Sequence, residues 1–257
     1  MKKALLIVCV FVCSVFYVSA QQTSEQVSKV KKSLKSIDWT PHYKGEVNVG
    51  YAVTGSKFNW DCEYTDSDGN YEGESGDAMR TVFSRPLIET IHGVEVGPYL
   101  FVGAGIGLQY YCGKVKEVKD LFAMTDEIYQ KADRWNAVML PIFANIKFKY
   151  PVNDKLAPFL NLGLGGTIGC YSSFNHQTDE TINGGHYSDG IKARGGFYCD
   201  FGAGLSYKLI NFGIGLQHQV FKMVSDGKAS YNGEHLNFKY VFKTPINAFY
   251  VKVGVNF

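Results

Sequence analysis

After residue 20 the sequence has no apolar run long enough to cross a membrane as a helix, which needs about 20 consecutive apolar residues. Beyond that point it also has no excess of charge of either sign. Two of the 26 basic residues, Lys2 and Lys3, belong to the first 20 positions, so 24 basic residues remain against 24 acidic ones. No basic stripe stands out, and the composition therefore argues against a nucleic acid as a partner. A solenoid-type repeat is absent as well.

The first 20 residues predict a secretory signal peptide. Lys2 and Lys3 supply a positively charged start, residues 4–18 form an apolar run, and Val18-Ser19-Ala20 is a small-residue cleavage site. The apolar run is shorter than a spanning helix needs, although an uncleaved anchor is the alternative interpretation. We expect cleavage near Ala20, after which the remaining chain is long enough for one all-β domain.

The last thirteen residues, 245–257, carry the clearest structural pattern. Counting back from Phe257 to Phe249, every second residue is a valine or a phenylalanine, and the positions between them include Lys252, Gly254 and Asn256. A strand with one apolar and one polar face, closed by an aromatic residue, suits a barrel with lipid outside and a polar interior. The aromatic content of 15% and the 28 glycines are typical of such barrels.

Seven further segments alternate in the same way: residues 43–54, 87–96, 99–111, 139–150, 157–171, 195–208 and 212–221. Short connections at 97–98, 151–156 and 209–211 alternate with long polar ones at 55–86, 112–138, 172–194 and 222–245. We therefore predict an eight-stranded antiparallel transmembrane β-barrel over residues 43–257, with short periplasmic turns and four long extracellular loops. Residues 21–42, with Val27, Val30, Leu34 and Ile37 at helical spacing, are expected to be a periplasmic lead-in.

Charged and amide side chains occupy the predicted inner positions of these strands. They are Glu46, Glu89, Glu95 and Asp200, Lys147, Lys149, Lys208 and Lys252, with Asn48, Asn145, Asn161, Gln217 and Gln219 between them. A soluble lipocalin-like barrel also has eight strands, but a sealed soluble core would not tolerate unpaired polar groups of this kind. The pattern favours membrane insertion, and we expect opposite charges to pair and to block a continuous water path.

The chain resembles the eight-stranded outer-membrane barrels of the OmpA and PorT-like kind found in Bacteroidetes. The resemblance rests on residues 94–107 (VEVGPYLFVGAGIG), 140–148 (LPIFANIKF), 157–166 (APFLNLGLGG) and the terminal strand, and it extends from Tyr43 onward. It implies an integral outer-membrane location in contact with outer-membrane lipids. It also implies that the barrel-assembly machinery recognises the end of the last strand with Phe257. Full-length OmpA has a peptidoglycan-binding domain after its last strand, and we expect no such domain in this chain.

Two motifs suggest a ligand but have simpler explanations. The Gly-x-Gly-x-Gly at 103–107 lies within a predicted strand, whereas a dinucleotide-binding loop must open a helix, so we interpret these glycines as space for long inner side chains. Residues 66–77 imitate an EF-hand calcium loop, but Tyr71 stands where the loop needs glycine. An acidic hairpin tip with Asp68-Gly69 in the turn is the alternative. Both interpretations of 66–77 remain open.

Histidines and cysteines give no convergent catalytic set. His92 and His218 take outer positions without a serine two residues away, and His186 and Ser188 fall in a predicted loop, so we interpret the first two as isolated wall histidines. Four cysteines lie beyond the signal peptide: Cys62, Cys112, Cys170 and Cys199. Cys62 with Cys112, or Cys170 with Cys199, could form a disulfide, and free buried thiols are the equal alternative.

The second long loop contains an amphipathic helical pattern that we expect to cap the barrel mouth: Val118, Leu121, Phe122, Thr125, Ile128, Tyr129 and Ala132. The expected role is a structural anchor and surface-interaction protein that acts through its loops, with an unnamed surface ligand. We expect no enzymatic activity, and we predict no catalytic, cofactor-binding or metal-binding residue. A small porin, or an outer-membrane lipid-modifying enzyme, is the alternative.

Overall fold

The computed structural model describes residues 39–65, 71–118, 134–153, 155–172, 176–182, 185–231 and 234–257. The chain divides into residues 1–40 and 41–257, and the second unit holds the barrel. The predicted signal peptide, most of the lead-in, the first half of the calcium-like loop and the loop helix lie outside the described residues. Among the described residues, no helix is long and apolar enough to span a membrane.

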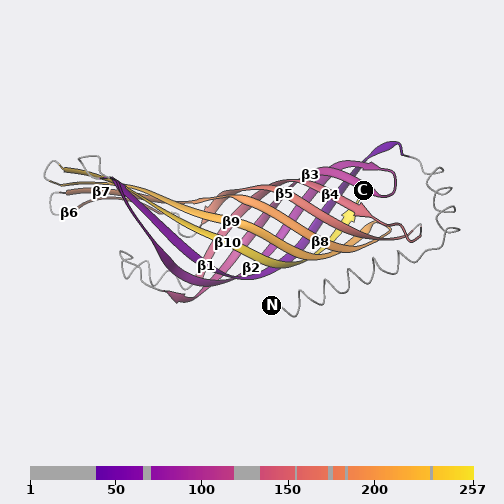
Figure 1. The fold of residues 1–257 in the computed structure, drawn as a ribbon, viewed down its shortest axis with the longest axis horizontal. Helices are drawn as coiled ribbons and strands as arrows, with labels where there is room; N and C mark the ends of the chain where they lie inside the picture. The colour runs from indigo at the N-terminus through magenta and orange to yellow at the C-terminus, as the bar shows by residue number, and fades with distance from the viewer. Residues whose placement is uncertain are drawn as a thin grey trace. The chain divides into compact units, whose positions relative to one another are not determined.

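The described residues form ten strands, and every paired neighbour is antiparallel (Figure 1). The strands are β1 (Pro41–Thr65), β2 (Tyr71–Val96), β3 (Leu100–Val118), β4 (Arg134–Lys149), β5 (Leu156–Ser172), β6 (His176–Ile182), β7 (Gly185–Arg194), β8 (Phe197–Tyr207), β9 (Ile210–Tyr231) and β10 (Glu234–Asn256). Pairing of β10 with both β1 and β9 closes β1–β5 and β8–β10 into an eight-stranded barrel. The predicted fold class is confirmed.

The strand register gives the stagger of the barrel. A row of directly paired residues runs once around it: Asn247, His218, Cys199, Leu164, Ala144, Ala104, His92, Gly45 and Phe257. The row leaves β10 at Asn247 and returns to the C-terminal end of the same strand at Phe257. The stagger of the barrel is therefore ten residues. With a rise of about 3.3 Å per residue and a strand spacing of about 4.8 Å, this stagger tilts the strands by about 40°.

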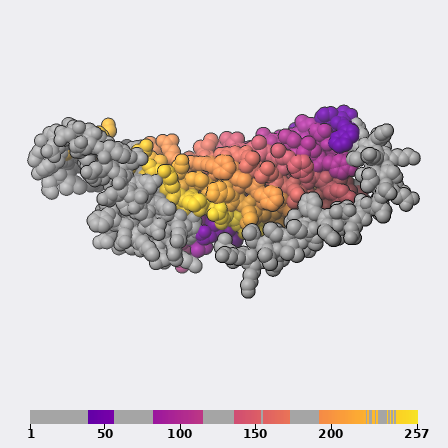
Figure 2. Space-filling model, in the orientation of Figure 1, coloured from indigo at the N-terminus to yellow at the C-terminus, as the bar shows by residue number. Residues whose placement is uncertain are grey.

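The outer wall of the barrel is apolar along the stretch between the two ends of the barrel. On the face drawn in Figure 2, successive strands form a continuous wall of side chains. Phe249, Val251, Val253 and Val255 of β10 are all exposed, and outward positions on the other barrel strands are similarly apolar. The ten residue steps from Asn247 to Phe257 along the tilted strand rise about 25 Å in the direction of the barrel axis, which is the height of the lipid-facing band of outer-membrane barrels.

Most of the predicted long connections continue as paired strands beyond the barrel and so form hairpins. β1 continues to Thr65 and pairs with β2 from Tyr71, while β9 continues to Tyr231 and pairs with β10 from Glu234. The predicted loop 172–194 contains the β6–β7 hairpin, including His186 and Ser188. Beyond the apolar wall both faces of a hairpin can be polar, so apolar alternation fades although backbone pairing continues.

Two strand ends differ from the prediction. Pro41 and His42 pair with Val96 and Glu95, so β1 begins two residues earlier than expected. β8 ends at Tyr207, and Lys208 stands in the following turn with a φ of 54°. Lys208 is therefore exposed, and the prediction that it points into the barrel was wrong. We call the end of the barrel with the short turns the turn end, and the other the hairpin end.

Candidate functional site

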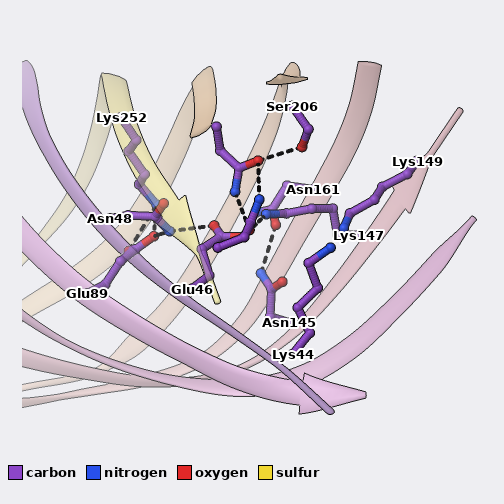
Figure 3. Close-up of polar contacts among 12 residues, drawn as sticks. Lys44, Glu46, Asn48, Glu89, Asn145, Lys147, Lys149, Asn161, Ser206 and Lys252 are labelled. Carbon is purple, nitrogen blue, oxygen red and sulfur yellow. Dashed lines mark hydrogen bonds and ion pairs between the residues drawn. The ribbon is translucent and has the colours of Figure 1, made fainter. Parts of the chain in front are cut away.

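A buried ion-pair network crosses the centre of the barrel (Figure 3). Lys252 of β10 lies between two carboxylates, with Nζ 2.9 and 3.0 Å from the Glu89 oxygens on β2 and 2.9 Å from Asp200 Oδ2 on β8. Glu89 is 4% exposed and Asp200 is 1% exposed. Both acids are withdrawn from water and need a nearby cation. This one lysine pairs with both of them and so links two separate strands.

Amide side chains extend the network to the neighbouring strands. Asn48 donates to Glu46 at 2.7 Å and to Glu89 at 3.2 Å. Lys147 donates to the second oxygen of Glu46 and lies 4.6 Å from the centroid of the Phe159 ring. On the other side Asn161 donates to Asp200 at 3.1 Å and accepts from Asn145 at 2.9 Å. The network thus joins β1, β2, β4, β5, β8 and β10.

A second ion-pair cluster lies near the turn end. Glu95 accepts from Lys44 at 2.8 Å and from Lys149 at 2.5 Å, and His42 approaches it at 3.4 Å. Each carboxylate oxygen of Glu95 accepts a hydrogen bond from a different lysine, so both oxygens are paired. Ser206 and the amides of Asn211 and Asn256 form a separate set of hydrogen bonds at 2.5–3.0 Å.

Toward the hairpin end a third polar layer surrounds Arg85. We call Arg85, Gln109, Tyr111, Gln217 and Gln219 the Arg85 layer. Arg85 donates to the hydroxyl of Tyr111 at 2.6 Å, to Gln219 at 3.3 Å, and to the side-chain oxygen of Gln217. The sequence prediction missed Arg85 because it assigned residues 55–86 to a loop. The alternating inner positions Phe83, Arg85, Leu87 and Glu89 carry the signal that could have found it.

Apolar side chains fill the space between these layers. Ile91, Phe101, Phe143 and Tyr198 form one buried cluster, and a side chain on Gly105 would run into the Phe143 ring. This contact supports the interpretation that inner glycines make room for long neighbours. The cavity beside the central network, lined by Glu46, Glu89, Lys147 and Lys252, has room for about one water molecule.

The predicted inner residues come together as expected, except Lys208. Those that are buried are Glu46, Asn48, Glu89, Glu95, Asn145, Lys147, Asp200, Gln217, Gln219 and Lys252. Lys149 and Asn161 are half-buried and belong to the same networks. The predicted pairing of opposite charges is confirmed for the described residues.

The ring nitrogens of the two wall histidines lie within hydrogen-bond distance of uncharged side chains. His92 Nδ1 lies 2.6 Å from the Tyr43 hydroxyl and Nε2 lies 2.8 Å from Thr90 Oγ1, while His218 Nδ1 lies 2.8 Å from the Asn247 side-chain oxygen. In the part of the chain that the structure describes, neither histidine contacts a carboxylate. His92 and His218 therefore lie at the two ends of the apolar wall as separate polar positions.

The cysteines are free where the structure describes them. Cys112, Cys170 and Cys199 are free thiols, and the side chain of Cys62 lies outside the described residues. Direct pairing of Cys199 with Leu164 leaves Cys170 six residues further along β5, so the two do not face each other. Cys170 is an exposed free thiol, so the alternative of free buried thiols does not hold for it. No group of three or more potential metal ligands occurs among the described residues, and the side chains of 66–77 are not among them.

No family model matches the sequence, and no curated protein matches it. Among solved structures, the chain is similar to Ail, the attachment invasion locus protein of Yersinia pestis, with 11% identity over 84% of this chain and 99% of that one and a TM-score of 0.30. It is also similar to the outer membrane protease OmpT from Escherichia coli, with 6% identity over 82% and 97% and a TM-score of 0.34. Both are outer-membrane β-barrels. At these values the similarity assigns neither a family nor an activity.

Proposed function

We propose that the protein is an integral outer-membrane barrel that anchors surface-exposed hairpins and conducts no solutes. One observation carries the proposal: ion pairs and packed side chains close the interior, whereas the hairpins extend beyond the apolar wall. In this account residues 1–20 direct export and are then removed. The barrel wall contacts outer-membrane lipids, and recognition occurs on the hairpins.

The closed interior argues for an anchor rather than a porin. A porin-sized lumen requires more strands, because eight strands enclose a space that side chains can fill. Here the central network pairs Glu46 with Lys147, and it pairs both Glu89 and Asp200 with Lys252. Opening a water path through it would separate buried opposite charges, which is unfavourable in a low-dielectric interior. We therefore interpret the barrel as an anchor for its hairpins rather than as a porin.

The hairpins provide the surface for interaction. From Asn247, at the end of the apolar wall, β10 continues through 13 residues to Glu234, about 43 Å of extended chain. β1 continues similarly to Thr65, and β7 pairs with β9 from Arg194 to His186. These strands continue the wall as backbone-paired sheet, so any bound partner would meet an ordered scaffold.

The end of the last strand fits a role in assembly, as the resemblance to outer-membrane barrels implies. The N–H and C=O of Phe257 both pair with Gly45 at 2.9 Å, so the seam between β1 and β10 runs to this residue. The Phe257 ring also packs edge-on against His92, with centroids 6.0 Å apart. We propose that the barrel-assembly machinery recognises this segment before the seam closes.

Shortened hairpins test the proposed role on intact cells. Joining Trp60 to Gly76 and Ser225 to Tyr240 through two-residue turns cuts both hairpins at paired positions. We expect the shortened protein to fold and reach the membrane but to lose the surface partners that cross-linking recovers with the wild type. A partner profile unchanged by this shortening would contradict recognition by the hairpins.

A further inference from the structure

Arg85 is a buried cation that donates hydrogen bonds to uncharged side chains among the described residues. The residue is 1% exposed, and within the described part of the chain its guanidinium donates only to Tyr111, Gln217 and Gln219. Among the described residues, no carboxylate lies within ion-pairing distance of it. An arginine side chain does not lose its proton in a protein, so this charge persists.

The other interior acids of the described residues are already in ion pairs with lysines. Four carboxylates and four lysines make up the remaining ion pairs: Glu46, Glu89, Glu95 and Asp200 with Lys44, Lys147, Lys149 and Lys252. Each of these acids already contacts at least one lysine. Glu89 lies on the same strand as Arg85, but four residues away, about 13 Å along an extended chain. Among the described residues, Arg85 is therefore a buried charge that belongs to none of these ion pairs.

The same layer contains buried hydrogen-bond donors without an acceptor. Arg85 Nε, Gln109 Nε2 and Gln219 Nε2 have no hydrogen-bond partner, although all three are shielded from solvent. The oxygens of both glutamines are already used, since each lies within hydrogen-bond distance of the Tyr111 hydroxyl, at 3.2 and 2.7 Å. A positive charge and three unused N–H donors in one layer call for a negatively charged acceptor.

We propose that the Arg85 layer binds a single small monovalent anion, with chloride as the physiological ion. A monatomic anion accepts several N–H groups from different directions and neutralises the guanidinium, whereas water satisfies donors but leaves the charge. Arg85, Gln109 and Gln219 are each at most 1% exposed, so the site has no access for a larger ligand. The ion would tie β2, β3 and β9 together across the hairpin half of the barrel.

Chloride-dependent stability tests the site. The refolded wild-type barrel would be unfolded in urea at constant sodium concentration, with chloride exchanged for gluconate. At a chloride concentration ten times the dissociation constant, the unfolding equilibrium constant should fall about elevenfold. Crystals grown in bromide should show anomalous density in the Arg85 layer. Equal urea midpoints in chloride and gluconate would overturn the proposal, and so would a bromide map that shows only water there.

Two variants identify the residues responsible. Arg85→Met removes the charge and should abolish the chloride effect. Gln219→Glu supplies an internal carboxylate beside Arg85, so it should raise stability in gluconate and remove the response to chloride. Lys155→Met, at an exposed turn residue, should keep the wild-type response. If Arg85→Met does not fold, Gln219→Glu decides. A chloride effect that persists in either folded variant contradicts the assignment.

Discussion

Replacing Lys252 by methionine removes the cation that two buried carboxylates share. In the wild type Glu46 pairs with Lys147, and Glu89 and Asp200 share Lys252, so the variant leaves three acids with one lysine. Methionine keeps most of the side-chain length, and the main loss is therefore electrostatic. Removing one partner of a buried ion pair costs about 3–5 kcal/mol, and contact with two acids places this change in the upper half of that range.

The variant should accordingly unfold at lower urea concentration, with a loss of about 4 kcal/mol, close to a thousandfold in the unfolding equilibrium constant. Circular dichroism and the heat-sensitive gel band would follow unfolding in the same lipid or detergent. The double variant Lys252→Met with Glu89→Gln removes one of the two stranded acids and should recover part of the loss. Lys155→Met is the control for loss of an exposed lysine. A change below about 1 kcal/mol in Lys252→Met would refute the argument that this network supports the barrel.

Three further predictions follow from the barrel itself. Because closure pairs the barrel strands and leaves the barrel no free edge, unboiled and boiled protein should migrate differently on a detergent gel; identical migration would count against a closed barrel. Gly105→Leu should lose about 1–3 kcal/mol in urea unfolding because its side chain meets the Phe143 ring, whereas Ala104→Leu on the outer wall should fold like the wild type. Phe257→Asp should lower the folded yield in the membrane far more than Val47→Ala does, since it changes the residue that closes the seam; similar yields would remove the assembly role.

The barrel was predictable wherever one face of a strand meets lipid and the other meets the interior. Residues 249–257 and 100–110 alternate because each second side chain has a different solvent, and the inner charges followed from the same parity. That parity ended at Tyr207, so Lys208 was wrongly placed inside. Beyond the apolar wall the hairpins were assigned to loops, since backbone hydrogen bonds rather than alternating side chains hold them together.

The partners within the interior were not predictable from the sequence. Pairing of Lys252 with Glu89 and Asp200, rather than with Glu46, depends on the stagger of ten residues, which emerges only when the barrel closes. Arg85 was missed for a related reason: its neighbours Ser84 and Pro86 are not apolar enough to mark an outer face. Side-chain parity alone, continued from Glu89, would have placed it inside.

Conductance in planar bilayers tests the central claim most directly, namely that this barrel is an anchor with a closed interior. The purified wild-type protein, free of native porins, should insert without any stable, large conductance, because buried ion pairs cross the interior and the cavity beside them has room for about one water molecule. Reproducible porin-sized current steps from the wild-type protein would contradict the account and establish a pore instead.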